Sequence, residues 1–137
     1  MKAIADTGFI VAFANSDDLH HEWALQVGAR LSPPALTCEA VLAEAAFHLR
    51  SADVVLELIQ AQLLRPAFDL TAHLVQLAEL AARYADRKPD LADLCLIRMS
   101  ELHPQHVLLT VDETDFRVYR RNKRDMLPLL CPAKPRR

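Results

Sequence analysis

Glycine and cysteine are both scarce in this sequence of 137 residues. The only glycines are Gly8 and Gly28, whereas dinucleotide-binding and phosphate-binding loops need several glycines close together. Both kinds of nucleotide-binding loop are therefore excluded. The three cysteines, Cys38, Cys95 and Cys131, are far apart and odd in number, which predicts neither a disulfide framework nor a Cys-x-x-Cys zinc site. We therefore expect a reducing, cytoplasmic setting.

Long hydrophobic runs are absent as well. No stretch approaches the roughly 18 consecutive apolar residues of a membrane-spanning helix, so we expect no membrane partner. Lys2 and the apolar stretch 8–14 loosely imitate a secretory signal, but Asp6 lies between them, and we interpret this segment as part of the mature protein. The length and the hydrophobic share of 52% predict a single globular domain over residues 1–137.

The formal net charge is only −2, but its contributions are separated along the chain. Residues 1–116 carry 8 Lys and Arg against 17 Asp and Glu, a net charge of −9. Residues 117–137, here called the basic C-terminal segment, carry 8 Lys and Arg against Asp125 alone, a net charge of +7. An acidic body joined to a basic end is an asymmetry that suggests a charged partner such as nucleic acid.

Short apolar runs alternate with amphipathic segments along the chain. The expected strands are residues 2–5, 35–37, 65–68, 106–111 and 127–130. The expected helices are residues 8–15, 17–31, 38–50, 51–64, 69–84, 90–102 and 114–119. Strands separated by helices predict an α/β fold, in which a short parallel sheet is covered by helices on both faces.

Two of the expected strands end in a carboxylate, which matters because ligands bind at the carboxyl ends of the strands in open parallel sheets. Asp6 follows the first strand, and Asp112 follows the fourth with Asp115 close behind. A single such aspartate is explained as the cap of the next helix. Two strand ends of this kind, with further acidic residues beside them, favour a binding site.

The helix expected at residues 90–102 carries two more carboxylates on an otherwise apolar segment. Asp90 has an ordinary role as the N-cap of this helix, but Asp93 is surrounded by apolar residues. A buried, unpaired carboxylate costs several kcal/mol, whereas the helix dipole returns only about 0.3–1 kcal/mol. Asp93 therefore needs a partner, either an arginine, for example from the basic C-terminal segment, or a bound cation that Asp90 shares.

The helix expected at residues 38–50 carries Glu39 and Glu44. Glu39 lies in the first turn, where its charge complements the helix dipole, whereas Glu44 has no such role. Both glutamates flank the apolar arc of the helix at similar angles, so the helical arrangement alone does not choose between them. His48, one turn after Glu44, is interpreted as a surface or boundary histidine.

Together these acids form a set of hard oxygen donors without cysteine or histidine. Such a set favours Mg²⁺ or Mn²⁺ over zinc or copper, with one or two ions bound. An ion held by carboxylates activates water and stabilises the charge that develops when a phosphodiester is hydrolysed. The proposed ligands are Asp6, Glu44, Asp93 and Asp112, with Asp90 and Asp115 in supporting positions.

Four segments resemble the four motifs of PIN-domain proteins, in the usual order. They are Asp6-Thr7-Gly8, residues 37–44 (TCEAVLAE), residues 90–93 (DLAD) and residues 110–116 (TVDETDF). The resemblance is greatest to VapC-like toxins of bacterial toxin–antitoxin pairs. It implies a three-layer α/β/α sandwich, Mg²⁺- or Mn²⁺-dependent ribonuclease activity, an antitoxin partner and a homodimer. Gly8 departs from the family pattern, where Ser or Asn is commoner.

The resemblance also assigns roles to individual residues. It places the helix acid at Glu44, and it makes Asp6, Glu44, Asp93 and Asp112 the catalytic metal-binding acids. Asp90 and Asp115 match positions that are often acidic in the family. Thr7 and Thr110 are implied to be hydroxyls close to the site.

An RNA substrate offers an explanation for the basic C-terminal segment. Five of its side chains directly follow the Asp112 motif and are candidate contacts to phosphates: Arg117, Arg120, Arg121, Lys123 and Arg124. The alternative is that they form a solvated face that balances the acidic body. The helices between residues 17 and 64 are in turn a candidate groove for an antitoxin peptide or a second subunit.

Other magnesium-dependent α/β proteins fit less well. A receiver domain has adjacent acids after its first strand and a lysine near its last, and a haloacid dehalogenase-type phosphatase has Asp-x-Asp at the first strand. Here Thr7 follows Asp6, position 8 is glycine, and no lysine ends the strand at 106–111. A PIN-domain nuclease of RNA processing that is not a toxin, and a non-catalytic PIN scaffold that binds RNA or protein, remain as alternatives.

Overall fold

Five parallel strands form the centre of the molecule. The computed structural model describes residues 1–134, and residues 135–137 of the basic C-terminal segment lie outside the described part. The strands are β1 (Ala3–Ala5), β2 (Ala35–Thr37), β3 (Leu64–Pro66), β4 (Val107–Leu109) and β7 (Leu129–Leu130), arranged in the order β3-β2-β1-β4-β7. This sheet, flanked by helices, confirms the expected α/β fold.

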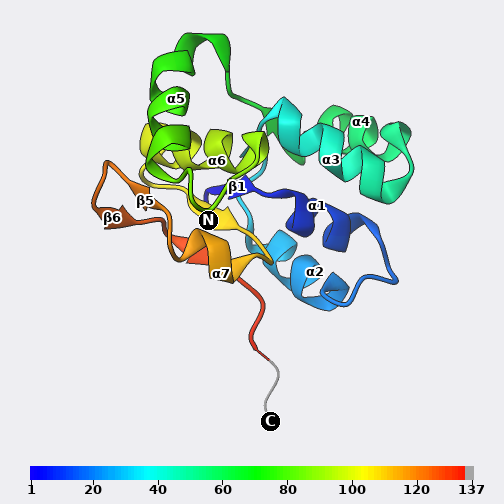
Figure 1. The fold of residues 1–137 in the computed structure, drawn as a ribbon. Coiled ribbons are helices and arrows are strands. Elements are labelled where there is room, and N and C mark those ends of the chain that lie inside the picture. The colour runs from blue at the N-terminus through cyan, green and yellow to red at the C-terminus, as the bar shows by residue number, and fades with distance from the viewer. Residues whose placement is uncertain (135–137) are drawn as a thin grey trace.

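The helices connect the strands in two groups, which meet where α3 lies beside α6 (Figure 1). The first group is α1 (Thr7–Ala14), α2 (His21–Arg30), α3 (Glu39–Leu49) and α4 (Ala52–Gln60), which carry the chain from β1 through β2 to β3. The second group is α5 (Leu74–Arg83) and α6 (Leu91–Leu102), which return it across the sheet to β4. Because such crossovers are right-handed, groups that run in opposite directions cover opposite faces of the sheet.

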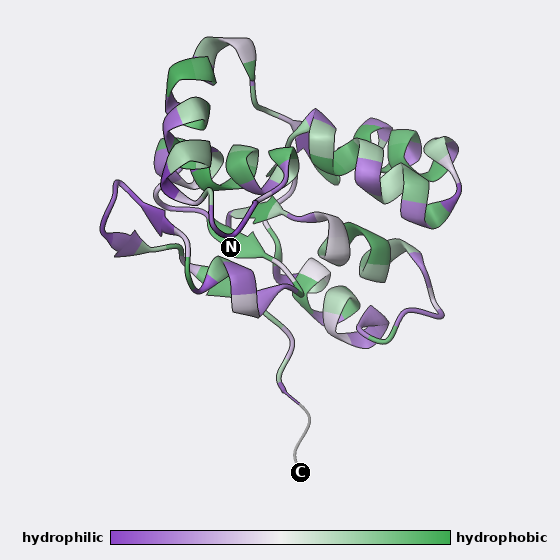
Figure 2. Cartoon of the chain, viewed as in Figure 1, coloured by the Kyte–Doolittle hydropathy of each residue, from purple (hydrophilic) through white to green (hydrophobic). Residues whose placement is uncertain are grey.

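The strands are short and almost wholly apolar because helices cover both of their faces. Ile4 of β1 lies in the middle of the sheet, where it pairs with Leu36 of β2 and Leu108 of β4. All three residues of β1 are buried. Figure 2 shows the hydrophobic strands and helix faces gathered at the centre. No helix among residues 1–134 is both long and apolar enough to cross a membrane.

The prediction for α2 was four residues too long at its start. The helix begins at His21, not at Asp17. The side chain of Asn15 accepts a hydrogen bond from the backbone N–H of Asp17 at 3.0 Å, and that of Asp18 accepts one from His20 at 2.8 Å. Such local bonds stabilise turns at the expense of helix, so residues 15–20 form a loop.

Several other boundaries also differ from expectation. The helix predicted for residues 51–64 ends at Gln60, because Gln62 takes a left-handed backbone conformation and Leu64 already pairs with β2. The strand predicted for 106–111 is confined to β4, and the last one to β7. The short helix α7 (Glu113–Phe116) stands for the one predicted at 114–119. A short 3₁₀ turn, Thr71–His73, precedes α5.

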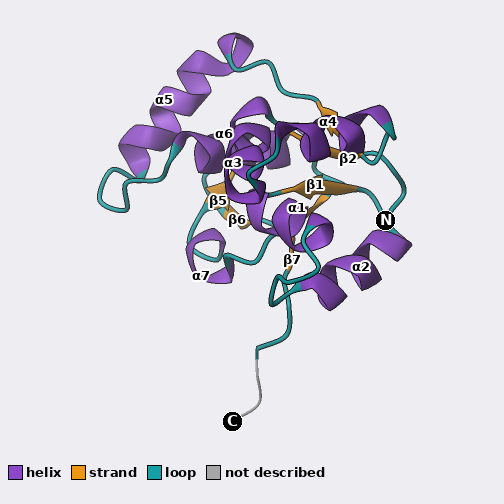
Figure 3. Ribbon diagram, turned by 90° about the vertical axis from the view of Figure 1, so that its right-hand side faces the viewer, coloured by secondary structure: helices purple, strands orange, loops and turns teal. Residues whose placement is uncertain are grey.

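The sequence analysis missed one element, a hairpin within the basic C-terminal segment. It consists of β5 (Arg120–Arg121) and β6 (Asp125–Met126), which pair antiparallel. Asn122 and Lys123 in the turn between them both have positive φ angles, 52° and 68°. This hairpin stands beside α6 at one side of the molecule, away from α1 and α2 (Figure 1). Figure 3 shows the strands of the central sheet enclosed by helices.

Candidate active site

A cleft of about 620 Å³ opens at the carboxyl ends of the central strands. It gathers side chains from segments far apart in the sequence, because parallel strands bring their carboxyl ends to one edge. All six carboxylates proposed from the sequence line it: Asp6, Glu44, Asp90, Asp93, Asp112 and Asp115. Asp18 adds a seventh acid, and four cationic or titratable side chains complete the rim: His20, His48, Arg87 and Lys88.

Asp6 is the most deeply buried of the six proposed acids and is held at both oxygens. It follows β1, and its Oδ1 accepts the backbone N–H of Thr7 at 2.7 Å, which caps α1. Its Oδ2 accepts the hydroxyl of Thr110 at 2.7 Å. Burial raises the pKa of Asp6 to about 6, although both hydrogen bonds favour the charged form. The two hydrogen bonds thus fix the orientation of the Asp6 carboxylate, and its raised pKa shows that they do not offset the cost of burying its charge.

Thr110 links the two strand-end aspartates. While its hydroxyl donates to Asp6, the same oxygen accepts the backbone N–H of Asp112 at 3.0 Å. Asp112 in turn caps α7, since its Oδ1 accepts the N–H of Asp115 at 3.3 Å. Partial burial raises the pKa of Asp112, and the neighbouring acidic side chains raise it further. The ends of β1 and β4 are therefore tied together by a hydroxyl lying behind the carboxylates.

Glu44 faces the cleft, whereas Glu39 does not. The hydroxyl of Thr7 donates to Oε2 of Glu44 at 3.0 Å, across the gap between α1 and α3. Glu39 is exposed and lines a separate hollow beside Phe68 and Leu91. The structure thus brings Glu44, and not Glu39, to the carboxylate cluster. Thr7, one of the two threonines that the sequence analysis singled out, lies beside it.

Asp90 and Asp93 enter the cleft from the start of α6. Asp90 is exposed, and its Oδ1 accepts the N–H of Asp93 at 2.8 Å, so it caps the helix. Asp93 is half-buried rather than fully buried, and no hydrogen-bond donor within residues 1–134 reaches its carboxylate. Burial raises the pKa of Asp93 to about 8, with additional contributions from the charges of Asp90, Asp6, Asp112 and Asp115.

The arginine partner considered for Asp93 is not found. No arginine in the described part of the chain, which includes residues 117–134 of the basic C-terminal segment, pairs with Asp93. Among the same residues, the one ion pair on the cleft joins Arg87 of the α5–α6 loop to Asp115, at 3.9 Å, and both side chains are exposed enough for water to weaken it. The negative charge of the cluster is therefore largely uncompensated by the protein.

The donor set fits a hard divalent cation in its chemistry. Carboxylate oxygens are the ligands that Mg²⁺ and Mn²⁺ prefer, and a cation would offset the charge that raises the pKa values of Asp6 and Asp93. Among residues 1–134, no three His, Cys, Asp or Glu side chains are placed to hold one ion, so the fit lies in the chemistry of the donors rather than in their spacing.

Three of the five basic residues proposed for RNA are bonded within the protein. Arg117 pairs with Glu113 at 3.1 Å. The guanidinium of Arg120 donates to three carbonyls at the end of α7, and that of Arg121 donates to the carbonyls of Ser100 and Pro104. Lys123 and Arg124, on the hairpin, are exposed. The structure brings none of the five to the lining of the cleft.

The sequence analysis missed Tyr119 and the rim of the cleft. Tyr119 is 1% exposed, and its ring packs edge-on against Tyr84 and Phe116, yet it lines the cleft. Burial and the nearby carboxylates raise its pKa. Arg87 and Lys88 lie just before the 90–93 motif, separated from it by Pro89. This position in the sequence could have identified them as part of the cleft. Tyr119 offered none, because it resembles an ordinary core aromatic.

Gly8 lies against the side chain of Val111. A Cβ atom at position 8 would overlap Cγ2 of Val111, which follows β4 next to Asp112. The side chain of Val111 therefore occupies space that Ser or Asn at position 8 would need. The absence of a side chain at Gly8 is thus matched by the side chain of Val111, which fills the space beside it.

The comparisons with known proteins agree with this geometry. The model of one family, the PIN domain, matches residues 3–122. A search of curated protein sequences returned no match. PIN domains have a nuclease-type fold and are generally metal-dependent nucleases. The match spans β1 to the hairpin turn and includes every carboxylate that lines the cleft. With its parallel sheet and acidic cleft, this chain belongs to the PIN domain family.

Proposed function

We propose that this protein is a metal-dependent endoribonuclease that hydrolyses RNA phosphodiester bonds in the acidic cleft. The observation that carries the proposal is the gathering of six carboxylates with so little compensating charge. Asp6 and Asp93 in particular have pKa values raised to about 6 and about 8. Clusters with such perturbed values mark functional sites more often than structural ones.

The acids have different parts in this proposal. Asp6, Glu44, Asp93 and Asp112 hold one or two Mg²⁺ or Mn²⁺ ions, with Asp90 and Asp115 in support. When bound, the metal activates water and neutralises the charge on the phosphate. The hydroxyls of Thr7 and Thr110 keep Glu44 and Asp6 turned towards the cleft.

Asp93 is the strongest candidate for the residue on which ion binding depends most. Its carboxylate accepts no hydrogen bond from residues 1–134, so both of its oxygens are open to a ligand. The oxygens of Asp6, in contrast, are both bonded. A group that is half-buried, charged and unpaired gains most from a cation.

The RNA backbone needs positive charge beside this negative cluster. Arg87 and Lys88 on the rim supply it next to the carboxylates, and Lys123 and Arg124 on the hairpin supply it further away. Arg117, Arg120 and Arg121, the other proposed contacts, have to leave internal partners before they can bind a phosphate. We therefore rank the first four side chains above these three.

The decisive experiment compares cleavage of single-stranded RNA by two matched variants. Asp93→Asn is expected to lose cleavage by at least a hundredfold, because it removes the charge that holds the ion while keeping the shape. Asp86→Asn removes an exposed carboxylate outside the cleft and is expected to cleave like the parent protein. Cleavage should require added Mg²⁺ or Mn²⁺ and stop in EDTA.

Two results would overturn this proposal. Full cleavage in EDTA would exclude a role for the metal, and full cleavage by Asp93→Asn would exclude the cluster as the site. Binding of RNA by both proteins without cleavage under any metal condition would favour the non-catalytic scaffold instead. A circular dichroism spectrum that matches the parent protein shows that the Asp93→Asn variant is folded.

We further propose that the ribonuclease is the VapC-like toxin of a toxin–antitoxin pair, that it acts in the cytoplasm and that it forms a homodimer. An apolar hollow between α1, α2 and α4, lined by Phe9, Phe13, Leu31, Leu58 and Leu63, supports an antitoxin partner. It lies in the helices where the sequence analysis expected a groove for a peptide or a second subunit.

The toxin role is tested by expression in bacteria. Growth should stop when the parent protein is induced and continue when Asp93→Asn is induced. Co-expression of a short gene found directly upstream should restore growth. Normal growth with the active nuclease would support the alternative of an RNA-processing enzyme that is not a toxin.

A further inference from the structure

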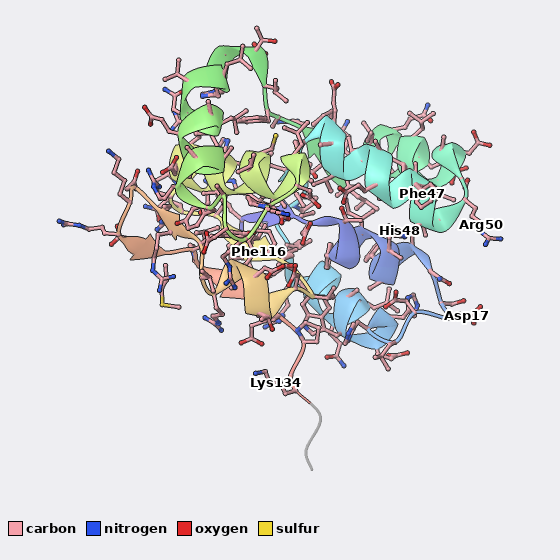
Figure 4. All side chains as sticks on the ribbon, viewed as in Figure 1. Asp17, Phe47, His48, Arg50, Phe116 and Lys134 are labelled. Carbon is pink, nitrogen blue, oxygen red and sulfur yellow. The ribbon has the colours of Figure 1, made fainter. Side chains whose placement is uncertain are left out.

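The last turn of α3 carries an exposed aromatic side chain next to the acidic cleft. Phe47 is 78% exposed, an unusual position for a ring of this size. It is the only large, exposed apolar side chain of α3, all of whose residues the structure describes. Figure 4 labels it with His48 and Arg50 at the end of the helix.

These residues line a hollow of about 540 Å³ together with Ala46. His48 lines both this hollow and the acidic cleft, so the two adjoin at this side chain. The rings of Phe47 and His48 meet edge-on, with centroids 5.5 Å apart and an angle of 73° between their planes. Because Phe47 is so exposed, this edge-on contact leaves ring surface open to a further planar group.

One helix therefore carries both the carboxylate and the aromatic ring. Glu44 precedes Phe47 by three residues and His48 by four, which places all three on neighbouring positions of α3. A ligand that reaches the cleft beside Glu44 meets this hollow within one helical turn. The distance between the two is fixed by the helix rather than by a flexible loop.

Arg50 adds a positive charge at the end of the helix. It takes a left-handed backbone conformation, with φ of 54°, and its N–H bonds to the carbonyl of Phe47. Glycine is the usual residue here, since it adopts this conformation without strain. The guanidinium of Arg50 forms no ion pair within residues 1–134 and is therefore available to an anion.

We propose that this hollow is a nucleobase subsite, in which an unpaired base of the RNA stacks on the Phe47 ring and Arg50 attracts its phosphates. The inference rests on the proposed ribonuclease function and adds the place on the protein, the last turn of α3, where one base of the substrate is held. Stacking on an aromatic side chain beside cationic groups is how proteins bind unpaired nucleotides. A base in a duplex is stacked between its neighbours and cannot enter.

The composition of the hollow favours a base over a protein partner. A stable protein interface buries about 800 Å² on each side around an apolar centre. Here a single aromatic ring stands among a histidine, an arginine and an alanine. The combination matches a planar base attached to an anionic backbone better than it matches a second apolar surface.

Binding of a short, non-hydrolysable RNA analogue to the protein in Mg²⁺ tests this inference, because Asp93 is kept and the ion can still bind. A single-stranded oligonucleotide is compared with a set in which each base in turn is removed but the backbone kept. Replacing Phe47 by Ala should weaken binding of the intact oligonucleotide about tenfold, equivalent to about 1.4 kcal/mol and within the range for base–aromatic stacking. Removal of one particular base from the oligonucleotide should weaken its binding to the parent protein by the same factor. In the Phe47→Ala variant, removal of that base should have no further effect.

The controls separate stacking from other losses. Phe47→Trp should bind at least as tightly as the parent protein, because indole stacks well on a base. Leu56→Ala removes a side chain that is 60% exposed on α4, away from the hollow, and should leave RNA binding unchanged. A duplex of the same sequence should bind equally well to the parent protein and to the Phe47→Ala variant.

Three results would overturn the subsite. If Phe47→Ala binds every oligonucleotide as the parent does, RNA does not stack here. If the variant loses a dimer in sedimentation while RNA binding is unchanged, the ring belongs to a protein interface. If neither protein binds RNA at all, the proposed function fails with it, whereas binding or cleavage that does not depend on Phe47 removes the subsite alone.

Discussion

The acidic cleft and the basic C-terminal segment are both strongly charged, but the protein treats the two charges differently. In the basic segment, Arg120 and Arg121 donate to backbone carbonyls and Arg117 pairs with Glu113. In the cleft, Asp93 has no partner within residues 1–134. Charges that a fold uses to hold itself together are thus satisfied internally. The carboxylate of Asp93 has no such role in the fold, and this difference cannot be seen by counting residues.

The largest expected effect is stabilisation of the folded protein by binding of a divalent ion in the cleft. At a Mg²⁺ concentration one hundred times its dissociation constant, the free energy of unfolding should rise by about 2.7 kcal/mol. Asp93→Asn should abolish this gain, whereas Arg121→Ala, in the basic segment, should lower the starting stability and leave the gain intact. Thermal unfolding with and without Mg²⁺ measures both. An equal gain in Asp93→Asn would show that the cleft is not where the ion binds.

The second effect is a dependence of stability on pH in the absence of divalent ions. Asp6 and Asp93 have pKa values of about 6 and about 8 in the folded protein, both above the ordinary value of 3.8. Their protonated forms are favoured by folding, so their stabilising contribution is complete below about pH 4 and is lost as the pH rises through 6 and then 8. Chemical denaturation at a series of pH values should show this decline.

The same series run on Asp93→Asn separates the two aspartates. The variant should lose the decline between pH 6 and 8 and, between about pH 4 and 6, keep only the part of the decline that Asp6 contributes. Because Asp93 is half-buried, water reduces the change below what full burial would give. If the pH profile of the variant is identical to that of the parent, the pKa of Asp93 is not raised in the folded protein.

The third effect compares two basic residues of the hairpin, Arg121, which is bonded within the protein, and Lys123, which is exposed. Arg121→Ala should cost about 1–2 kcal/mol of stability, since hydrogen bonds from a charged group to carbonyls are lost. Lys123→Ala should change stability by less than about 0.5 kcal/mol, as is usual for an exposed residue. In RNA binding the order should be opposite, and only Lys123→Ala should reduce the salt dependence of affinity.

This pair of variants has a clear contrary outcome. If Arg121→Ala is as stable as the parent protein and reduces the salt dependence of RNA affinity, the guanidinium of Arg121 binds RNA rather than stabilising the fold. Urea unfolding gives the stability, and RNA binding at a series of salt concentrations gives the slope.

The smallest expected effect concerns the wall of the cleft. Gly8→Ser should cost about 1 kcal/mol, because the new side chain meets Val111, which is 36% exposed and can partly move away. Gly8→Ser with Val111→Ala should recover most of this loss. A double-mutant cycle measured by denaturation tests the coupling, which would be disproved by simple additivity of the two changes.

The fold was largely predictable because its strands are buried on both faces. Short apolar runs such as residues 107–109 indicate strands buried on both faces, and their alternation with helices favours parallel pairing. Boundaries were less predictable. Asn15 and Asp18 form turns that compete with the start of α2, and such local competition is not visible in a hydrophobic pattern.

The hairpin was missed for a different reason. Its strands have two residues each, and the usual turn signal of Asn followed by Gly is replaced by Asn122 and Lys123. Both nevertheless adopt the left-handed conformation that this signal predicts. With only two glycines in the chain, the left-handed positions that the structure describes, among them Arg50 and Lys88, are occupied by residues with side chains.

The gathering of the carboxylates was predictable because the set as a whole, and Asp93 by itself, were hard to explain by folding alone. Asp93 on an apolar helix was an anomaly of charge, and such anomalies can be found without knowing the fold. The Arg87–Asp115 pair and the packing of Tyr119 were not predictable, since they depend on contacts between the α5–α6 loop, α7 and the segment that follows it. The choice of Glu44 over Glu39 likewise needed the third dimension, or a family resemblance.

Asp6, Asp90 and Asp112 each cap a helix while they face the cleft, and this double position links the ion to the backbone. An ion that draws these carboxylates together also pulls on the amides they bond, those of Thr7, Asp93 and Asp115. Loading of the site should therefore be visible as slower hydrogen–deuterium exchange at the first turns of α1, α6 and α7. The helix ends would then report occupancy of the site before any substrate is added.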